Sequence, residues 1–133
     1  MKILFICKFN RFRSKIAESI FNKLNKNNKL KAKSAGIIMG RPISKEVLEA
    51  SKEKGYVIKG KPQGISSDLL IWQDAIIIVA DDVPTSLFKN NKKYGKKLII
   101  WKIPDTDSNN KKELQKIIYQ IEIKVKNLIK ELK

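Results

Sequence analysis

A thiol, a guanidinium and a hydroxyl stand close together near the start of the chain, at Cys7, Arg13 and Ser14. An apolar run ends at Cys7 and a helical pattern begins near Ser14, so the segment between them should connect a strand to a helix. Such a loop can aim backbone N–H groups and the positive end of the helix dipole at one tetrahedral oxyanion. Arg13 can hold two oxygens of that oxyanion, and the same positive field favours the thiolate of Cys7. The spacing therefore predicts a cysteine nucleophile that faces a bound phosphate.

Composition alone favours a simpler interpretation, in which Cys7 is a small buried residue at a strand end. Its placement relative to Arg13, across a strand-to-helix turn, favours the catalytic one. The chain has no histidine, which excludes Cys-His and Ser-His nucleophile pairs, imidazole bases and the common zinc sites. The single cysteine excludes an internal disulfide and a multi-cysteine metal cage, and we expect the cytoplasm, a reducing compartment, as the location.

Cleavage of a phosphoester by a thiolate also needs a proton for the leaving oxygen, and Asp105 is the candidate donor. It follows a predicted strand, and loops at that edge of a parallel sheet converge on the loop that contains Cys7. The same carboxylate could then take a proton from the water that attacks the phosphocysteine. Asp105 could instead be a turn residue, and Asp107 competes for the acid role. Asp81 and Asp82 end another predicted strand and could line the edge of the site, but they are interpreted first as loop or cap residues.

Strand and helix patterns alternate along the rest of the chain. Short apolar runs predict strands over residues 3–6, 30–34, 75–79 and 98–101. Apolar residues at helical spacing predict helices over residues 14–24, 43–54 and 67–72, and from near Pro84 to Gly95. Local signals mark their ends: Ser14 and Ser44 are candidate N-caps, Ala35-Gly36 is a predicted turn, and Gly55 is a predicted helix stop.

Strands that alternate with helices imply parallel βαβ units with right-handed crossovers. We therefore predict an α/β fold, a small open doubly wound four-stranded parallel sheet with helices on both faces, in one domain over residues 1–133. Ligands bind such sheets beyond the carboxyl ends of the strands, which points to the loops after the first and fourth strands. The last helix has an apolar stripe that should pack on the sheet, although its spacing also suits a coiled coil: Leu114, Ile117, Ile118, Ile121, Val125, Leu128, Ile129 and Leu132.

The sequence resembles the low-molecular-weight protein tyrosine phosphatases and the related thioredoxin-coupled arsenate reductases over nearly its whole length. The resemblance rests on the apolar strand before Cys7 and on Asn10, Arg13, Ser14, Ala17-Glu18, Ser34-Ala35-Gly36, Pro42, Gly55, the hydrophobic strand ending at Asp81, and Pro104-Asp105. It implies a four-stranded parallel sheet wrapped by helices. It also implies that Cys7 is the nucleophile, Arg13 the phosphate clamp and Asp105 the general acid. Ser14 would help to stabilise the thiolate, and Asn10 would hold the loop in an unusual conformation.

The loop departs from the family pattern in several places. Phe12 stands where the family usually has a second cysteine, Phe9 where many members have glycine, and Arg11 where a small or apolar residue is usual. After Asp105 the chain lacks the aromatic residues that favour a phosphotyrosyl ring, and Phe9 or Phe12 could replace them or pack inward. The predicted substrate-binding residues are Lys8, Phe9, Asn10, Arg11, Phe12, Arg13 and Ser14.

The combined prediction is a phosphomonoester hydrolase of the protein tyrosine phosphatase type, with a cysteinyl-phosphate intermediate and no metal or organic cofactor. Its expected ligands are a phosphorylated protein or a small phosphomonoester, and inorganic phosphate or a similar oxyanion. Two alternatives stay open. One is an arsenate reductase that uses an external thiol, since one cysteine cannot pass electrons to an internal disulfide. The other is a non-catalytic module that binds an oxyanion or a phosphopeptide.

The chain is strongly basic, with 29 Lys and Arg against 13 Asp and Glu, a net charge of +16. This surplus would attract polyanions such as nucleic acid. Nucleic-acid binding is not favoured, because no RNA-binding aromatic motif accompanies the charge, and a composition bias on a solvated surface accounts for it equally well. No apolar run approaches the roughly 20 residues that a spanning helix needs, so we expect no membrane partner.

Overall fold

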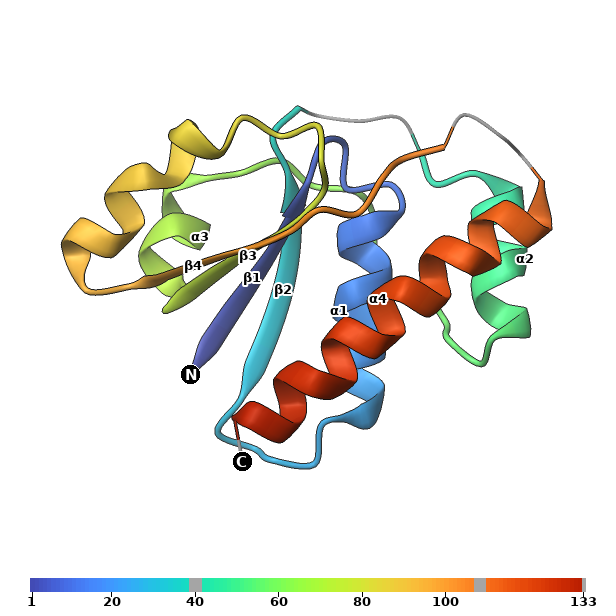
Figure 1. Ribbon diagram of the computed structural model, residues 1–133, viewed down its shortest axis with the longest axis horizontal. Coiled ribbons are helices and arrows are strands. Elements are labelled where there is room, and N and C mark those ends of the chain that lie inside the picture. The colour runs from blue at the N-terminus through green and yellow to red at the C-terminus, as the bar shows by residue number, and fades with distance from the viewer. Residues whose placement is uncertain (39–41, 107–109, 133) are drawn as a thin grey trace.

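Four parallel strands form the centre of the protein in the computed structural model, which describes residues 1–38, 42–106 and 110–132. They are β1 (Lys2–Cys7), β2 (Lys31–Gly36), β3 (Ala75–Val79) and β4 (Lys97–Trp101), in the spatial order β2-β1-β3-β4 (Figure 1). From β1 the chain crosses first to β2 on one side and later to β3 on the other. The carboxyl ends of β1 and β3 therefore form a topological switch point, where α/β sheets bind ligands. The predicted α/β fold is confirmed.

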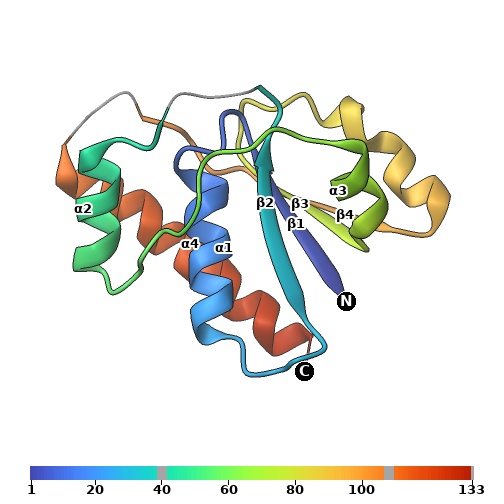
Figure 2. The same ribbon diagram turned by 180° about the vertical axis from the view of Figure 1, so that it is seen from behind.

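Helices lie on both sides of the sheet (Figures 1 and 2). On one side are α1 (Arg13–Leu24) and α4 (Lys111–Glu131), with α2 (Lys45–Glu53) packed against α4. On the other side are α3 (Ser67–Trp72) and η1 (Thr85–Tyr94), a run of 3-10 turns. None of the helices in the described part of the chain is long and apolar enough to span a bilayer.

Covering both faces explains why β1 and β3 are continuous apolar runs and not alternating ones. Successive residues of β1 point into two separate cores, with Phe5 on the side of α1 and α4 and Leu4 on the side of α3 and η1. Most of the apolar stripe of α4 is buried in the first of these cores, beside α1 and Phe5: Leu114, Ile117, Ile118, Ile121, Val125 and Leu128. The stripe thus packs within the domain, as predicted.

Two predicted signals at element ends are confirmed. Ser44 caps α2, since its hydroxyl accepts a hydrogen bond from the N–H of Val47 at 3.2 Å. Gly55 ends the same helix region with a φ of 91°, which glycine adopts without strain. Beyond it, the Tyr56 hydroxyl donates to the carboxylate of Glu122 on α4, and burial together with this bond raises the pKa of Tyr56.

Two local predictions are wrong. The N-cap position of α1 is Phe12, which makes no side-chain capping bond, while Ser14 lies within the first turn and uses its hydroxyl elsewhere. The predicted turn at Ala35-Gly36 is the end of β2, because pairing with β1 continues to the pair Cys7 and Gly36. The helix predicted from near Pro84 to Gly95 is present, as the 3-10 helix η1.

Gly36 lets β2 pass close to the loop that follows β1. A Cβ at this position would lie 2.7 Å from the carbonyl carbon of Phe9 and 2.8 Å from the backbone nitrogen of Asn10. Both are backbone atoms, which cannot rotate aside as a side chain could. The strand end and the loop therefore fit together only without a side chain at residue 36.

We expect Gly36→Ala to lower the free energy of unfolding by about 1–3 kcal/mol, the usual cost of overpacking. Gly64→Ala is the matched control, because a Cβ there would meet nothing nearer than the carbonyl oxygen of Gly36 at 3.9 Å. Urea denaturation followed by the fluorescence of Trp72 and Trp101 measures both variants. Equal stabilities of the two variants would contradict this account of Gly36.

Candidate active site

The residues singled out from the sequence meet at the carboxyl edge of the sheet. Cys7 is the last residue of β1, residues 8–12 form the loop, and Arg13 begins α1. Asp105 reaches the same place from the segment after β4, as the sheet topology predicts. They line one pocket of about 210 Å³, together with Phe9, Arg11, Phe12, Ser44, Val47, Thr106 and Leu114. The other predicted loop residues, Lys8, Asn10 and Ser14, do not line this pocket, and the last two are fully buried.

Asn10 holds the loop from the inside. Its φ of 55° is the only positive φ of a non-glycine residue in the described part of the chain. The side-chain Oδ1 accepts from the N–H of Gln63 at 2.9 Å, while Nδ2 donates to Ser14 Oγ at 2.7 Å and to Ser34 Oγ at 3.0 Å. Because a backbone N–H can only donate, Gln63 fixes which end of the amide is the oxygen. One side chain thus joins the loop to α1, to β2 and to the segment before α3.

This amide also sets the direction of the hydrogen bonds around Cys7. The hydroxyl of Ser14 accepts one N–H of Asn10, so its own hydrogen is available to the Cys7 sulfur, 3.0 Å away. The backbone N–H of Asn10 points to the same sulfur at 3.3 Å. Two donors therefore face the sulfur and orient it at the end of β1.

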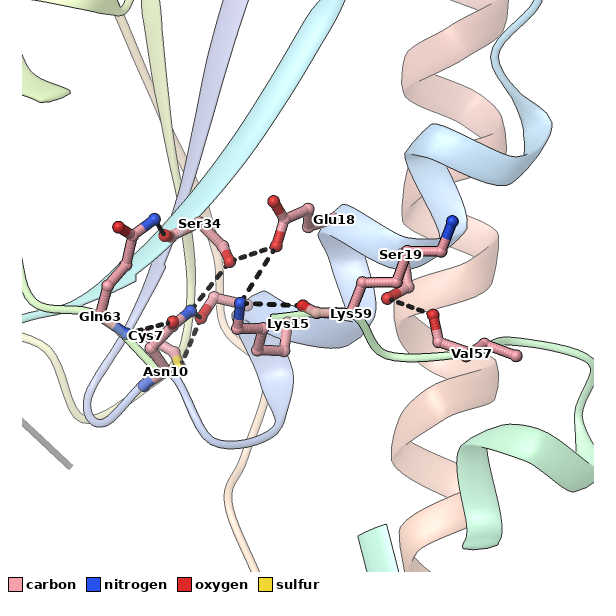
Figure 3. Close-up of polar contacts among 10 residues, drawn as sticks. Cys7, Asn10, Lys15, Glu18, Ser19, Ser34, Val57, Lys59 and Gln63 are labelled. Carbon is pink, nitrogen blue, oxygen red and sulfur yellow. Dashed lines mark hydrogen bonds and ion pairs between the residues drawn. The ribbon is translucent and has the colours of Figure 1, made fainter. Parts of the chain in front are cut away.

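Ser34 extends the network to a buried lysine (Figure 3). Its hydroxyl donates to Glu18 Oε1 at 2.7 Å, which leaves its lone pairs for Asn10. Glu18 in turn lies 3.7 Å from the ammonium of Lys15, and Lys15 is 5% exposed. The chain of hydrogen bonds that begins at the Cys7 sulfur therefore ends at the Glu18 carboxylate, which can only accept.

Residues 55–59 are attached to α1 by three side chains one turn apart, and Figure 3 draws the first two, those of Lys15 and Ser19. Lys15 donates to the carbonyl of Lys59, Ser19 to that of Val57, and Lys23 to that of Gly55. Residues four apart on a helix rise about 6 Å, and alternate residues of an extended chain are about 6.6 Å apart, so the two repeats match. The attached segment continues to Gln63, which also donates through Nε2 to the carbonyl of Ser34 at 2.8 Å. The helix therefore helps to place the backbone that orients the Asn10 amide.

Arg13 is the buried cation of the site, with 2% of its side chain exposed. Its Nη1 donates to the carbonyl of Ile103 at 2.9 Å, and its Nη2 contacts the two carboxylate oxygens of Asp82 at 2.9 and 3.2 Å. The carboxylates of Asp81 and Asp105 lie 3.7 and 3.6 Å from the guanidinium. These contacts fix the plane of the guanidinium and surround it with negative charge.

Asp82 makes the main contact of the site that the sequence does not predict, since it is interpreted first as a loop or cap residue that could line the edge of the site. Its place directly after β3, the strand beside β1, is the signal that could have found it. Asp105 lies where the acid was predicted, and its Oδ1 accepts from the N–H of Thr106 at 2.9 Å. The competing Asp107 lies outside the described residues. Among the residues that the structure describes, no group of three or more Cys, Asp or Glu could hold a metal ion.

The two loop phenylalanines have different surroundings. Phe12 is 6% exposed and belongs to the core beneath α1 and α4, although it also contributes to the pocket lining. Phe9 lines the pocket and is partly exposed, with the ammonium of Lys8 5.2 Å from its ring centre. Of the two, Phe9 is the aromatic side chain available to a substrate ring.

Comparison with known proteins places the chain among phosphatases of similar size. The family model "Low molecular weight phosphotyrosine protein phosphatase" matches residues 2–133. The low molecular weight protein tyrosine phosphatase from T. tengcongensis is similar in structure, with a TM-score of 0.84 and 26% identity over 98% of this chain and 99% of that one. An arsenate reductase from Archaeoglobus fulgidus has a TM-score of 0.74 and 27% identity over 96% and 98%. The arginine phosphatase YwlE from Geobacillus stearothermophilus shares the fold, with a TM-score of 0.83 and 19% identity over 98% and 92%. No curated protein matches the sequence.

Ser14→Ala removes one of the two donors that face the Cys7 sulfur. We expect the rate of alkylation of Cys7 by iodoacetamide at neutral pH to fall by about tenfold, the effect of one hydrogen bond to a charged group. Ser19→Ala is the control, because Ser19 lies on the same helix and bonds only to the carbonyl of Val57. Mass spectrometry of the alkylated peptide gives the rates. The direction of the network is wrong if Ser14→Ala reacts as fast as Ser19→Ala.

Proposed function

The chain belongs to the low molecular weight phosphotyrosine protein phosphatase family, and we propose that it hydrolyses phosphomonoesters through a cysteinyl-phosphate intermediate on Cys7. The observation that carries this proposal is the single pocket lined by Cys7, Arg13 and Asp105. It supplies a nucleophile, a cation for the phosphoryl oxygens and a carboxyl group for proton transfer, which are the three groups that the reaction requires.

In the first step the thiolate of Cys7 attacks phosphorus, and the bond from phosphorus to the leaving oxygen breaks. Ser14 and the N–H of Asn10 hold the sulfur at the end of β1. The guanidinium of Arg13, fixed by Asp82, faces the charge on the phosphoryl oxygens. Asp105 gives its proton to the leaving oxygen, so the product departs as an alcohol or a phenol.

In the second step water attacks the phosphocysteine. The Asp105 carboxylate takes a proton from that water, the bond from sulfur to phosphorus breaks, and phosphate leaves. The thiolate and the protonated acid are restored, so the cycle needs no metal and no electron donor. The activity does require a free thiol, and we place the protein in a reducing compartment, the cytoplasm.

Two of the similar structures suggest other substrates for the same pocket. An arsenate reductase would use Cys7 to bind arsenate, but further electrons would have to come from an external thiol, because the chain has a single cysteine. YwlE is described as an arginine phosphatase, and at 19% identity it shares the fold alone. Phosphomonoester hydrolysis is favoured over simple oxyanion binding because Asp105 lines the pocket, and binding alone needs no proton donor. It is favoured over arsenate reduction because its cycle needs no second thiol.

Cys7→Ser should abolish turnover of para-nitrophenyl phosphate and keep the binding of inorganic phosphate, because Arg13 and the loop N–H groups remain. The wild type should release a burst of nitrophenol and yield a phosphorylated Cys7 peptide after acid quenching. Stopped-flow absorbance and mass spectrometry measure the two. Full activity in Cys7→Ser would exclude the proposed mechanism, and arsenate reduction with glutathione but no phosphatase activity would favour the reductase.

Asp105→Asn should slow the hydrolysis of phenyl phosphate by about 10²–10⁴-fold, the usual contribution of one general acid. The loss should be much smaller for para-nitrophenyl phosphate, because nitrophenolate departs without a proton. Steady-state kinetics of both substrates test this, with Asp107→Asn as the comparison. If Asp107→Asn shows the pattern and Asp105→Asn does not, the general acid is Asp107.

A further inference from the structure

The pocket contains two arginines whose charges are balanced very differently. Arg13 has the carboxylates of Asp81, Asp82 and Asp105 within 3.7 Å of its guanidinium. Arg11 lines the same pocket, yet it makes no ion pair with any residue that the structure describes. One positive charge of the pocket is thus neutralised by the protein and the other is not.

The Arg11 side chain is nevertheless held in place. Its Nε donates to the carbonyl oxygen of Pro42 at 3.1 Å, and the side chain is only partly exposed. A guanidinium is a planar group with five N–H donors, so one anchoring bond at Nε leaves the four N–H groups of Nη1 and Nη2. These four donate to no described residue. They have the geometry that grips a carboxylate or a phosphoryl group in bidentate fashion.

None of the neighbours of Arg11 among the described pocket residues offers a second unbalanced positive charge to an anion. The hydroxyl of Ser44 accepts from the N–H of Val47, the hydroxyl of Thr106 donates to Glu113, and neither group carries a charge. Asp105 is the only carboxylate among the described lining residues, and it lies beside Arg13. The positive charge of Arg11 is therefore available to a ligand in the pocket.

We propose that Arg11 binds a second anionic group of the substrate, a carboxylate or a phosphoryl group, so that the pocket selects phosphomonoesters that carry one. The inference rests on the proposed function, in which Cys7 and Arg13 take the first phosphoryl group. Arg11 and Arg13 both line this pocket of about 210 Å³, so one small molecule or two adjacent groups of a peptide can contact both residues. The same charge disfavours a substrate whose leaving group is cationic.

The test compares phenyl phosphate with its 3-carboxy, 3-phosphoryloxy and 3-aminomethyl derivatives on wild type, Arg11→Gln and Lys45→Gln. Lys45 is the control, since its exposed side chain lies next to Ser44 but does not line the pocket. The wild type should prefer the carboxylated or bisphosphorylated substrate over phenyl phosphate, and the aminomethyl one should be the poorest. Arg11→Gln should reduce that preference in kcat/KM by about 10- to 100-fold, mainly through KM, as expected for one charge-assisted pair. Lys45→Gln should keep it.

Comparison of the carboxylated with the bisphosphorylated substrate shows which anion Arg11 prefers. Equal losses on all four substrates in Arg11→Gln, or an unchanged preference, would overturn the proposal. Calorimetric binding of phenylphosphonate and 3-carboxyphenylphosphonate separates it from the proposed function, because phosphonates bind without turnover. If no aryl phosphate is hydrolysed but Arg11→Gln still loses the tighter binding of the carboxylated phosphonate, the phosphatase proposal fails and the role of Arg11 stands. If that binding difference is absent in the wild type, the role of Arg11 is excluded.

Discussion

The hydrogen bonds of one buried amide, that of Asn10, hold the catalytic loop in its shape. A left-handed backbone conformation is unfavourable for most residues other than glycine. Here Asn10 adopts it, and Asn10 has no exposed surface. Three hydrogen bonds from that side chain, to Gln63, Ser14 and Ser34, offset this cost and place the loop against three other segments. The same bonds leave the Ser14 hydroxyl as a donor to the Cys7 sulfur. The shape of the loop and the orientation of the Cys7 sulfur therefore depend on the same contacts.

Charge is distributed unevenly around the loop, and this unevenness separates the roles of the two pocket arginines. Arg13 is buried, so its charge is stable only with the carboxylate of Asp82 and the carbonyl of Ile103 as close partners. Arg11 is partly exposed, and water and one backbone carbonyl suffice for it. Arg13, which is held in place by its partners, and Arg11, whose charge is available to a ligand, are thus only two residues apart in the sequence. The net charge of +16 would help to draw anionic substrates toward both of them.

Much of the fold could be predicted from the sequence, because its strongest signals are local. The uninterrupted apolar strand β3 and the helix α4 with its apolar stripe each bury a continuous set of side chains. Such patterns can be recognised in the sequence without knowing which elements they pack against. The errors lie at element ends. Ser14 is of a residue type that is common at N-caps, but its hydroxyl contacts the sulfur of Cys7 instead. Gly36 suggests a turn, but strand pairing with β1 continues through it and the nearby loop explains why it is glycine.

The sequence by itself determined the chemistry of the site: the order of Cys7, Arg13 and Ser14 within one short segment, and an aspartate after the fourth strand. Cys7, Arg13 and Ser14 are close in sequence, and the parallel topology together with the family resemblance predicts that Asp105 joins them. Only the tertiary structure decided what supports them. Asp82 reaches Arg13 across 69 residues and Gln63 reaches Asn10 across 53. The place of Asp82 after a strand indicates the edge of the sheet but not its partner, and no local pattern marks Gln63. A buried charge or amide requires hydrogen-bond partners, and Asp82 and Gln63 supply them. Arg13 and Asn10 become buried only when the folded sheet brings the carboxyl ends of its strands together.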